Sequence, residues 1–156
     1  MSLSKPTYFE DLDVYASYKS DEITITAEEI RKYANQFDPQ PYHTDRSAAK
    51  DSIFGGLCAS GWHVCALMMK LLSSVMAREN IKLIGSDSVP SLKWLKPAFE
   101  GNKLHAEIEF TGKETDKLDP EFGVIKCNVK VLNQNQELVM DVKTTLMIKN
   151  KENYND

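Results

Sequence analysis

Two stretches of the chain carry hydrophobic residues at the spacing of an α-helix. The first follows Thr26, with Glu29 three residues later, a pair that can cap a helix because each side chain can accept from the other residue's backbone N–H. Its apolar positions lie three or four residues apart: Ile30, Tyr33, Ala34 and Phe37. This pattern predicts a helix over residues 27–37. Pro39 and Pro41 are expected to end it, because proline lacks the N–H that a helix needs.

A loop and a second, shorter helix are expected next. Residues 38–45 contain two prolines, which favours an irregular loop. Asp45 stands where its side chain can cap a helix over residues 46–50. Gly55 and Gly56 then interrupt the chain before the next apolar stretch.

The second helical stretch is apolar on nearly every face. Residues 61–79 contain no proline, and glycine occurs only at their first position. The apolar residues are Trp62, Val64, Cys65, Ala66, Leu67, Met68, Met69, Leu71, Leu72, Val75 and Met76. A helix that is hydrophobic all round is buried on most sides. We therefore expect a central core helix surrounded by other elements.

The chain after this helix has the alternation of β-strands. Residues 88–95 lead to a proline, which favours an edge strand or a strand end. Residues 104–110 and 125–131 alternate between apolar and polar side chains, and residues 140–146 return after a polar turn at residues 133–136. Only a curved sheet is available to cover the long helix. The sequence therefore predicts an α+β fold, a long central helix wrapped by a curved antiparallel sheet of about five strands, known as the hotdog fold.

Length and composition favour a single globular domain. The 156 residues suffice for one domain with a substantial core, with 42% hydrophobic and 27% charged residues. We expect this domain to span residues 1–150 and to be followed by a polar tail over residues 151–156.

Charge and targeting signals narrow the range of partners. The net charge of −4 argues against nucleic-acid binding, which usually needs a concentrated basic face. No apolar run approaches the roughly 18 residues that span a bilayer, and the first residues do not resemble a signal peptide. Three cysteines cannot all pair, which favours a reducing compartment. We expect a cytoplasmic protein with no nucleic-acid or membrane partner.

Candidate chemistry gathers on the proline-containing loop and at the start of the central helix. Asp38 and His43 lie five residues apart, and the prolines between them restrict the loop. A carboxylate and an imidazole that share one water can move a proton near neutral pH. At the helix start, the backbone N–H of Gly61 and the positive end of the helix dipole can stabilise a developing oxyanion. Ser60 either orients the substrate or His43, or caps the helix.

The combined pattern resembles the MaoC-like, or (R)-specific enoyl-CoA hydratase, family. The resemblance rests on residues 33–45 (YANQFDPQPYHTD) and 54–63 (FGGLCASGWH), and residues 92–97 (LKWLKP) resemble the strand after the central helix. The residues at the offsets of the family motif are Asp38, Pro41, His43 and Asp45. The similarity covers roughly residues 26–148, and the combined motif is specific.

The resemblance implies reversible syn addition of water to a trans-2-enoyl thioester, which gives an (R)-3-hydroxyacyl thioester on coenzyme A or a related carrier. It also implies no metal, no organic cofactor, and a homodimer or dimer of dimers with the pocket near the subunit interface. By this resemblance His43 activates the water, Asp38 orients it and supplies the proton to Cα, and the N–H of Gly61 polarises the carbonyl. The residues expected to bind the substrate are Gln40, Ser60 and Trp62.

Departures from the motif keep two other functions open. Gln40 replaces an asparagine, and Phe37 replaces the glycine that usually precedes the aspartate. These departures leave room for a non-catalytic protein that binds acyl thioesters. A hotdog thioesterase is the other alternative, but such enzymes typically use an acidic residue on or near the central helix, and residues 61–76 contain none.

Simpler interpretations of single residues also remain. Asp38 can begin a turn, His43 can be an ordinary loop histidine, and Trp62 can belong to the core. Histidines and cysteines near the helix start match no familiar zinc spacing, so a metal site is not expected. Cys58 as a nucleophile would need a base that the sequence does not identify.

Overall fold

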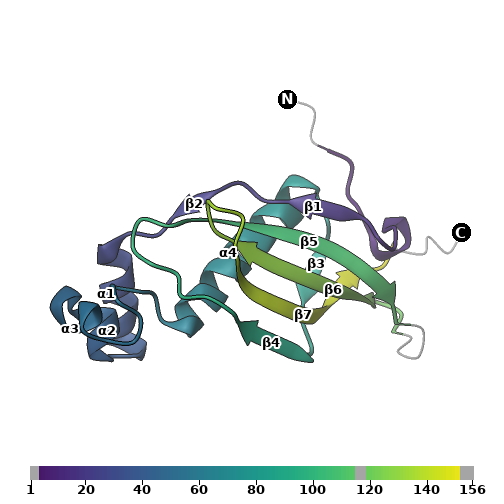
Figure 1. Ribbon diagram of the computed structural model, residues 1–156. Coiled ribbons are helices and arrows are strands. Elements are labelled where there is room, and N and C mark those ends of the chain that lie inside the picture. Colours follow the sequence, from purple (N-terminus) through teal and green to yellow (C-terminus); the bar gives the residue numbers. More distant parts are fainter. Residues whose placement is uncertain (1–3, 115–118, 152–156) are drawn as a thin grey trace, which may run out of the picture.

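The computed structural model describes residues 4–114 and 119–151 and confirms the α+β hotdog architecture (Figure 1). The helices are η1 (Phe9–Asp11, a 3-10 turn), α1 (Ala27–Phe37), α2 (Pro41–Thr44), α3 (Arg46–Lys50) and α4 (Gly61–Arg78). The strands are β1 (Ser17–Lys19), β2 (Ile23–Thr24), β3 (Leu83–Gly85), β4 (Ser91–Trp94), β5 (Lys103–Lys113), β6 (Phe122–Leu132) and β7 (Leu138–Lys149). Of the predicted tail, all but Lys151 lies outside the described residues.

The described strands form one antiparallel sheet. Its order is β1-β5-β6-β7-β3, with β2 also paired to β5 and β4 also paired to β7. The sheet has seven strands rather than the five or so expected. The difference comes from short strands: β2 has two residues and β3 has three, too few for an alternating pattern to be recognised.

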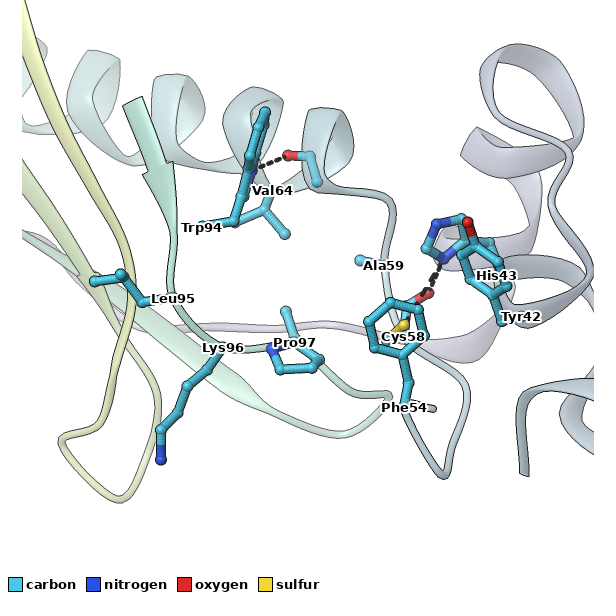
Figure 2. A pocket seen from close by; sticks show the side chains of 12 residues that line it. Tyr42, His43, Phe54, Cys58, Ala59, Val64, Trp94, Leu95, Lys96 and Pro97 are labelled. Carbon is cyan, nitrogen blue, oxygen red and sulfur yellow. Dashed lines mark hydrogen bonds between the residues drawn. The ribbon is translucent and has the colours of Figure 1, made fainter. Parts of the chain in front are cut away.

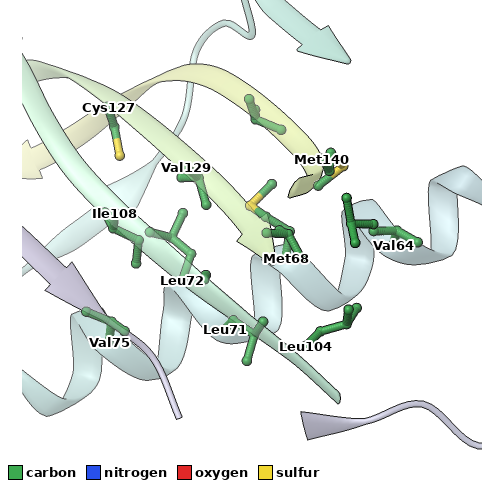
Figure 3. Packing of buried hydrophobic residues seen from close by; sticks show 14 of the residues in the cluster. Val64, Met68, Leu71, Leu72, Val75, Leu104, Ile108, Cys127, Val129 and Met140 are labelled. Carbon is green, nitrogen blue, oxygen red and sulfur yellow. The ribbon is translucent and has the colours of Figure 1, made fainter. Parts of the chain in front are cut away.

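The long helix α4 packs its buried side against the sheet. Figure 3 shows Leu72 and Val75 of α4 among Ile108 of β5 and Val129 of β6, and all four side chains are buried. This confirms the predicted long helix on the sheet. The expectation that it is buried on most sides was wrong in part, because the sheet covers one side and only seven of the 18 residues of α4 are buried. An exposed stripe remains along it: Trp62, Ala66, Met69 and Ser73. Within the described part of the chain, no helix is long and apolar enough to cross a membrane.

Local signals in the sequence correctly predicted where two helices begin. The Thr26 hydroxyl accepts from the N–H of Glu29 at 3.2 Å, and the Glu29 carboxylate accepts from the N–H of Thr26 at 3.3 Å, which confirms the capping box. The Asp45 carboxylate accepts from the N–H of Ala48 at 2.9 Å and begins α3 as predicted.

The prediction of an irregular loop over residues 38–45 was wrong in part. One helical turn, α2, forms there with Pro41 at its first position. Proline is well suited to that position, because its missing N–H would have no partner within the helix and its fixed φ is already helical. The three short helices α1, α2 and α3 lie together at one end of the sheet, next to the beginning of α4 (Figure 1).

Candidate functional site

His43 is held in one orientation by a backbone carbonyl. Its side chain lies in α2 and the residue is only 6% exposed. Nδ1 lies 2.7 Å from the carbonyl oxygen of Cys58. Because a carbonyl can only accept, Nδ1 carries the proton in the neutral imidazole and Nε2 keeps its lone pair. The fold therefore presents Nε2 as a proton acceptor.

The structure brings Asp38 and His43 together, as the sequence predicted. Asp38 ends α1, where its N–H donates to the carbonyl of Ala34 at 2.8 Å. Its Oδ2 lies 3.5 Å from Nε2 of His43, longer than a direct hydrogen bond. The Asp38 side chain is 28% exposed, so it is accessible to water. A water that contacts both groups would lie between an acceptor nitrogen and a carboxylate.

Ser60 fixes the orientation of Asp38 rather than capping α4. Its hydroxyl donates to Oδ2 of Asp38 at 2.7 Å, and the residue is fully buried. Ser60 is the residue just before α4, yet its side chain makes no capping hydrogen bond to the helix. The first turn of α4 thus keeps backbone N–H groups that this side chain does not cap, together with the positive end of the helix dipole.

Gly61 packs directly against Trp94. The Trp94 indole N–H donates to the carbonyl of Gly61 at 2.9 Å. A Cβ at position 61 would lie only 2.9 Å from Cε2 and Nε1 of the indole. The glycine is therefore required for close contact between the start of α4 and β4.

A cavity of about 380 Å³ lies beside this arrangement (Figure 2). His43 and Gly61 line it, together with three aromatic side chains that the sequence analysis did not select for the site: Tyr42, Phe54 and Trp94. Lys96 also borders it and pairs with Glu137. A concave, largely apolar cavity with a few convergent polar groups is the usual form of a small-molecule site.

The predicted substrate-binding residues do not line this cavity. Gln40 is exposed just before α2, and Ser60 is buried beneath Asp38. Trp62 is 61% exposed, and its ring forms a T-shaped contact with that of Trp94, with 5.0 Å between the ring centroids. Their contact with a substrate stays a prediction.

The Cys58 thiol is not set up as a nucleophile, although the structure supplies the neighbouring base that the sequence did not identify. Its Sγ lies 3.8 Å from Nδ1 of His43, but that nitrogen is already engaged with the Cys58 carbonyl. Burial raises the pKa of the Cys58 thiol to about 11, so it remains protonated at neutral pH. In residues 4–114 and 119–151, no group of three or more His, Cys, Asp or Glu side chains could hold a metal ion.

Comparison with known proteins gives consistent matches. The model of the MaoC like domain family matches residues 14–131. The MaoC-like dehydratase from Rhodospirillum rubrum is 32% identical, with a TM-score of 0.81, and the match covers 94% of this chain and 99% of that one. The uncharacterized protein YdeM of Bacillus subtilis (strain 168) is 24% identical over 133 residues, covering 85% of this chain and 92% of YdeM.

A more distant structure supports the fold alone. The (R)-hydratase from A. caviae involved in PHA biosynthesis is 22% identical, and the match covers 88% of this chain and 97% of that one. Its TM-score of 0.70 shows the same arrangement of the central helix and sheet.

Proposed function

The chain belongs to the MaoC-like domain family, and from that membership we propose that it is a hydratase or dehydratase acting on a trans-2-enoyl thioester and its (R)-3-hydroxyacyl counterpart. One observation carries the proposal. Nε2 of His43 keeps its lone pair because Nδ1 donates to the Cys58 carbonyl, and this nitrogen faces Asp38 beside a cavity that Gly61 also lines.

In the hydration direction, Nε2 of His43 accepts a proton from water while the water oxygen bonds to Cβ of the substrate. Electron density moves through Cα to the thioester oxygen. The proton on Nε2 of His43 then passes to the Asp38 carboxylate, whose Oδ2 is 3.5 Å away, and Asp38 delivers it to Cα. One water is consumed, and the two residues end in their starting protonation states.

In this proposal, the start of α4 stabilises the negative charge that develops on the thioester oxygen. The N–H of Gly61 donates to this oxygen, and the helix dipole adds to the stabilisation. The proposed step involves no metal and no organic cofactor. The proposed carrier is coenzyme A or a related thioester carrier.

The direct test follows the loss of the conjugated enoyl-thioester absorbance with crotonyl-CoA. The purified protein is expected to hydrate this substrate and to give the (R)-3-hydroxy product. Release of free thiol without loss of the double bond would indicate a thioesterase instead. Binding of the thioester with neither reaction would indicate a non-catalytic binding protein.

Replacing Ser60 by alanine is expected to lower kcat for crotonyl-CoA by about tenfold with little change in KM. The reason is that Oδ2 of Asp38 loses its buried donor, and an unmade hydrogen bond of this kind is worth roughly 1–3 kcal/mol. Steady-state kinetics measures the effect. Ser47→Ala, at an exposed position of α3, is the matched control and should match the wild type. Equal losses in both variants would contradict a positioning role for Ser60.

We further propose that a second copy of the chain covers the exposed stripe of α4. Among the described strands, β4 pairs only with β7 and so leaves one edge free. Next to that edge, Trp94 is 44% exposed, and its ring contacts the exposed Trp62. Aromatic side chains gathered at an unpaired edge are typical of protein interfaces.

Light scattering should accordingly give twice the mass of one chain at micromolar concentration. Trp62→Glu is expected to shift the protein toward the monomer, because it places a charge in an apolar contact. Lys50→Glu, at an exposed position of α3, is the control and should leave the mass unchanged. A wild-type mass equal to one chain across the concentration range would contradict this proposal.

A further inference from the structure

The cavity has a different aromatic boundary at each end. At one end, Trp94 contacts Gly61. At the other end, the rings of Tyr42 and His43 lie with their centroids 4.5 Å apart and their planes at 71°. The ring of Phe54 packs on Tyr42, with 5.1 Å between the two centroids. Figure 2 shows Trp94 on one side of the cavity and His43, Tyr42 and Phe54 on the other.

The chemistry of an enoyl thioester orders its atoms along this cavity. The carbonyl, Cα, Cβ and the rest of the acyl chain follow one another in the molecule. The proposed function assigns the carbonyl to Gly61 and the water attack at Cβ to His43. The acyl chain beyond Cβ must then continue past His43, away from Trp94.

Resting on that proposed function, we propose that the acyl chain ends against Tyr42 and Phe54, and that Phe54 limits its length. The carrier leaves the cavity at the opposite end, past Trp94 and Lys96, both of which line the cavity. Phe54 is thus a specificity-determining residue. The direction of the bound substrate is set by the aromatic side chains at the two ends, Tyr42 and Phe54 at one and Trp94 at the other.

The volume favours a short acyl chain. The whole cavity of about 380 Å³ must hold the thioester, a water and the acyl chain. A cavity of roughly 150 Å³ accommodates a ring of six carbons. On this scale, the space left beside the thioester and the water suits a short acyl group.

Phe54 can be changed with little risk to the fold. It lies in the segment between α3 and α4, is only partly buried, and does not belong to the main core cluster. Gly55 follows it with a φ of +69°, a left-handed conformation typical of a turn. A smaller side chain at position 54 therefore enlarges one end of the cavity without removing a core contact.

The test compares kcat/KM for crotonyl-CoA and for enoyl-CoAs of six and eight carbons. In Phe54→Ala, the ratio of the eight-carbon to the four-carbon value is expected to rise at least about tenfold, the discrimination that one methylene can produce in an apolar pocket. Ile53→Ala is the matched control, because Ile53 is the preceding residue, is 96% exposed and does not line the cavity. Its ratio should equal that of the wild type. Phe54→Leu provides a milder variant if Phe54→Ala melts well below the wild type.

Two results would overturn the inference while leaving the proposed function intact. An unchanged ratio in folded Phe54→Ala and Phe54→Leu would exclude Phe54 as the limit. A shift that appears in Trp94→Leu but not in the Phe54 variants would show that the substrate lies in the reverse direction. Failure of the wild type to hydrate any enoyl-CoA is a separate result, which would overturn the proposed function and this inference with it.

Discussion

Hydration of crotonyl-CoA by the His43→Ala variant is expected to be about 10²–10⁴-fold slower in kcat than hydration by the wild type, the usual loss for an acid/base group. The variant removes the only group in the proposed mechanism that takes the proton from water. Loss of the enoyl absorbance measures the effect. Ser47→Ala, on the neighbouring helix α3 and exposed, is the control and should keep full activity.

Asp38→Asn extends the same test to the second member of the pair. A comparable loss is expected, because an amide cannot deliver the carboxyl proton to Cα. In the double variant, the loss should be close to that of the more damaged single variant, since groups that act as a unit show strongly non-additive effects. Activity that survives both substitutions would show that the chemistry belongs to other residues.

Gly61→Ala keeps the backbone N–H but is expected to displace it from the thioester oxygen, which should lower kcat by up to about 10²–10³-fold, the loss typical of one missing oxyanion donor. The added Cβ would meet Cε2 and Nε1 of Trp94 at 2.9 Å, so either the indole or the first turn of α4 must move. This overpacking should also reduce the free energy of unfolding by roughly 1–3 kcal/mol. Kinetics and urea unfolding measure the two effects separately.

Two further variants separate the collision at Gly61 from a general effect of removing a glycine. Gly85→Ala is the matched control, because a Cβ there meets no atom within 4 Å. Gly61→Ala combined with Trp94→Leu should regain part of the lost stability, since the smaller side chain makes room. Full stability and activity in Gly61→Ala alone would contradict close packing at this point.

Elements with a long periodic pattern could be predicted from the sequence. The helix at α1 and the long central helix α4 were found at or within a residue of their observed ends, and the core of strands β5, β6 and β7 was recognised. The short strands β2 and β3 could not be predicted, because they contain two and three residues, fewer than the roughly four over which alternation can be recognised. The turn α2 was missed because two prolines indicate a break, although one of them is well placed to begin a helix.

The meeting of Asp38 and His43 could be expected from the sequence, because the two residues are close together in the chain. The carbonyl of Cys58 that sets the tautomer of His43 is a backbone group, and no residue type signals it. Likewise, Phe54 and Trp94 come together around one cavity only through the tertiary fold, so spacing along the chain gave no reason to select them.

The position of α1, α2 and α3 at one end of the sheet has a consequence for how the protein responds to heat. Asp38 and His43 belong to this small group, which contributes few buried side chains, whereas Ser60 and Gly61 lie at the start of α4, which has seven buried residues. Segments with little burial open locally at a lower free energy than the core. The geometry of the proposed Asp38–His43 pair is therefore expected to be lost on warming before the sheet melts. Faster amide hydrogen exchange in α2 and α3 than in β6 would accompany that loss. Adaptation of the protein to a colder or warmer environment can then proceed by changes in these three helices, with the central helix and its sheet left as they are.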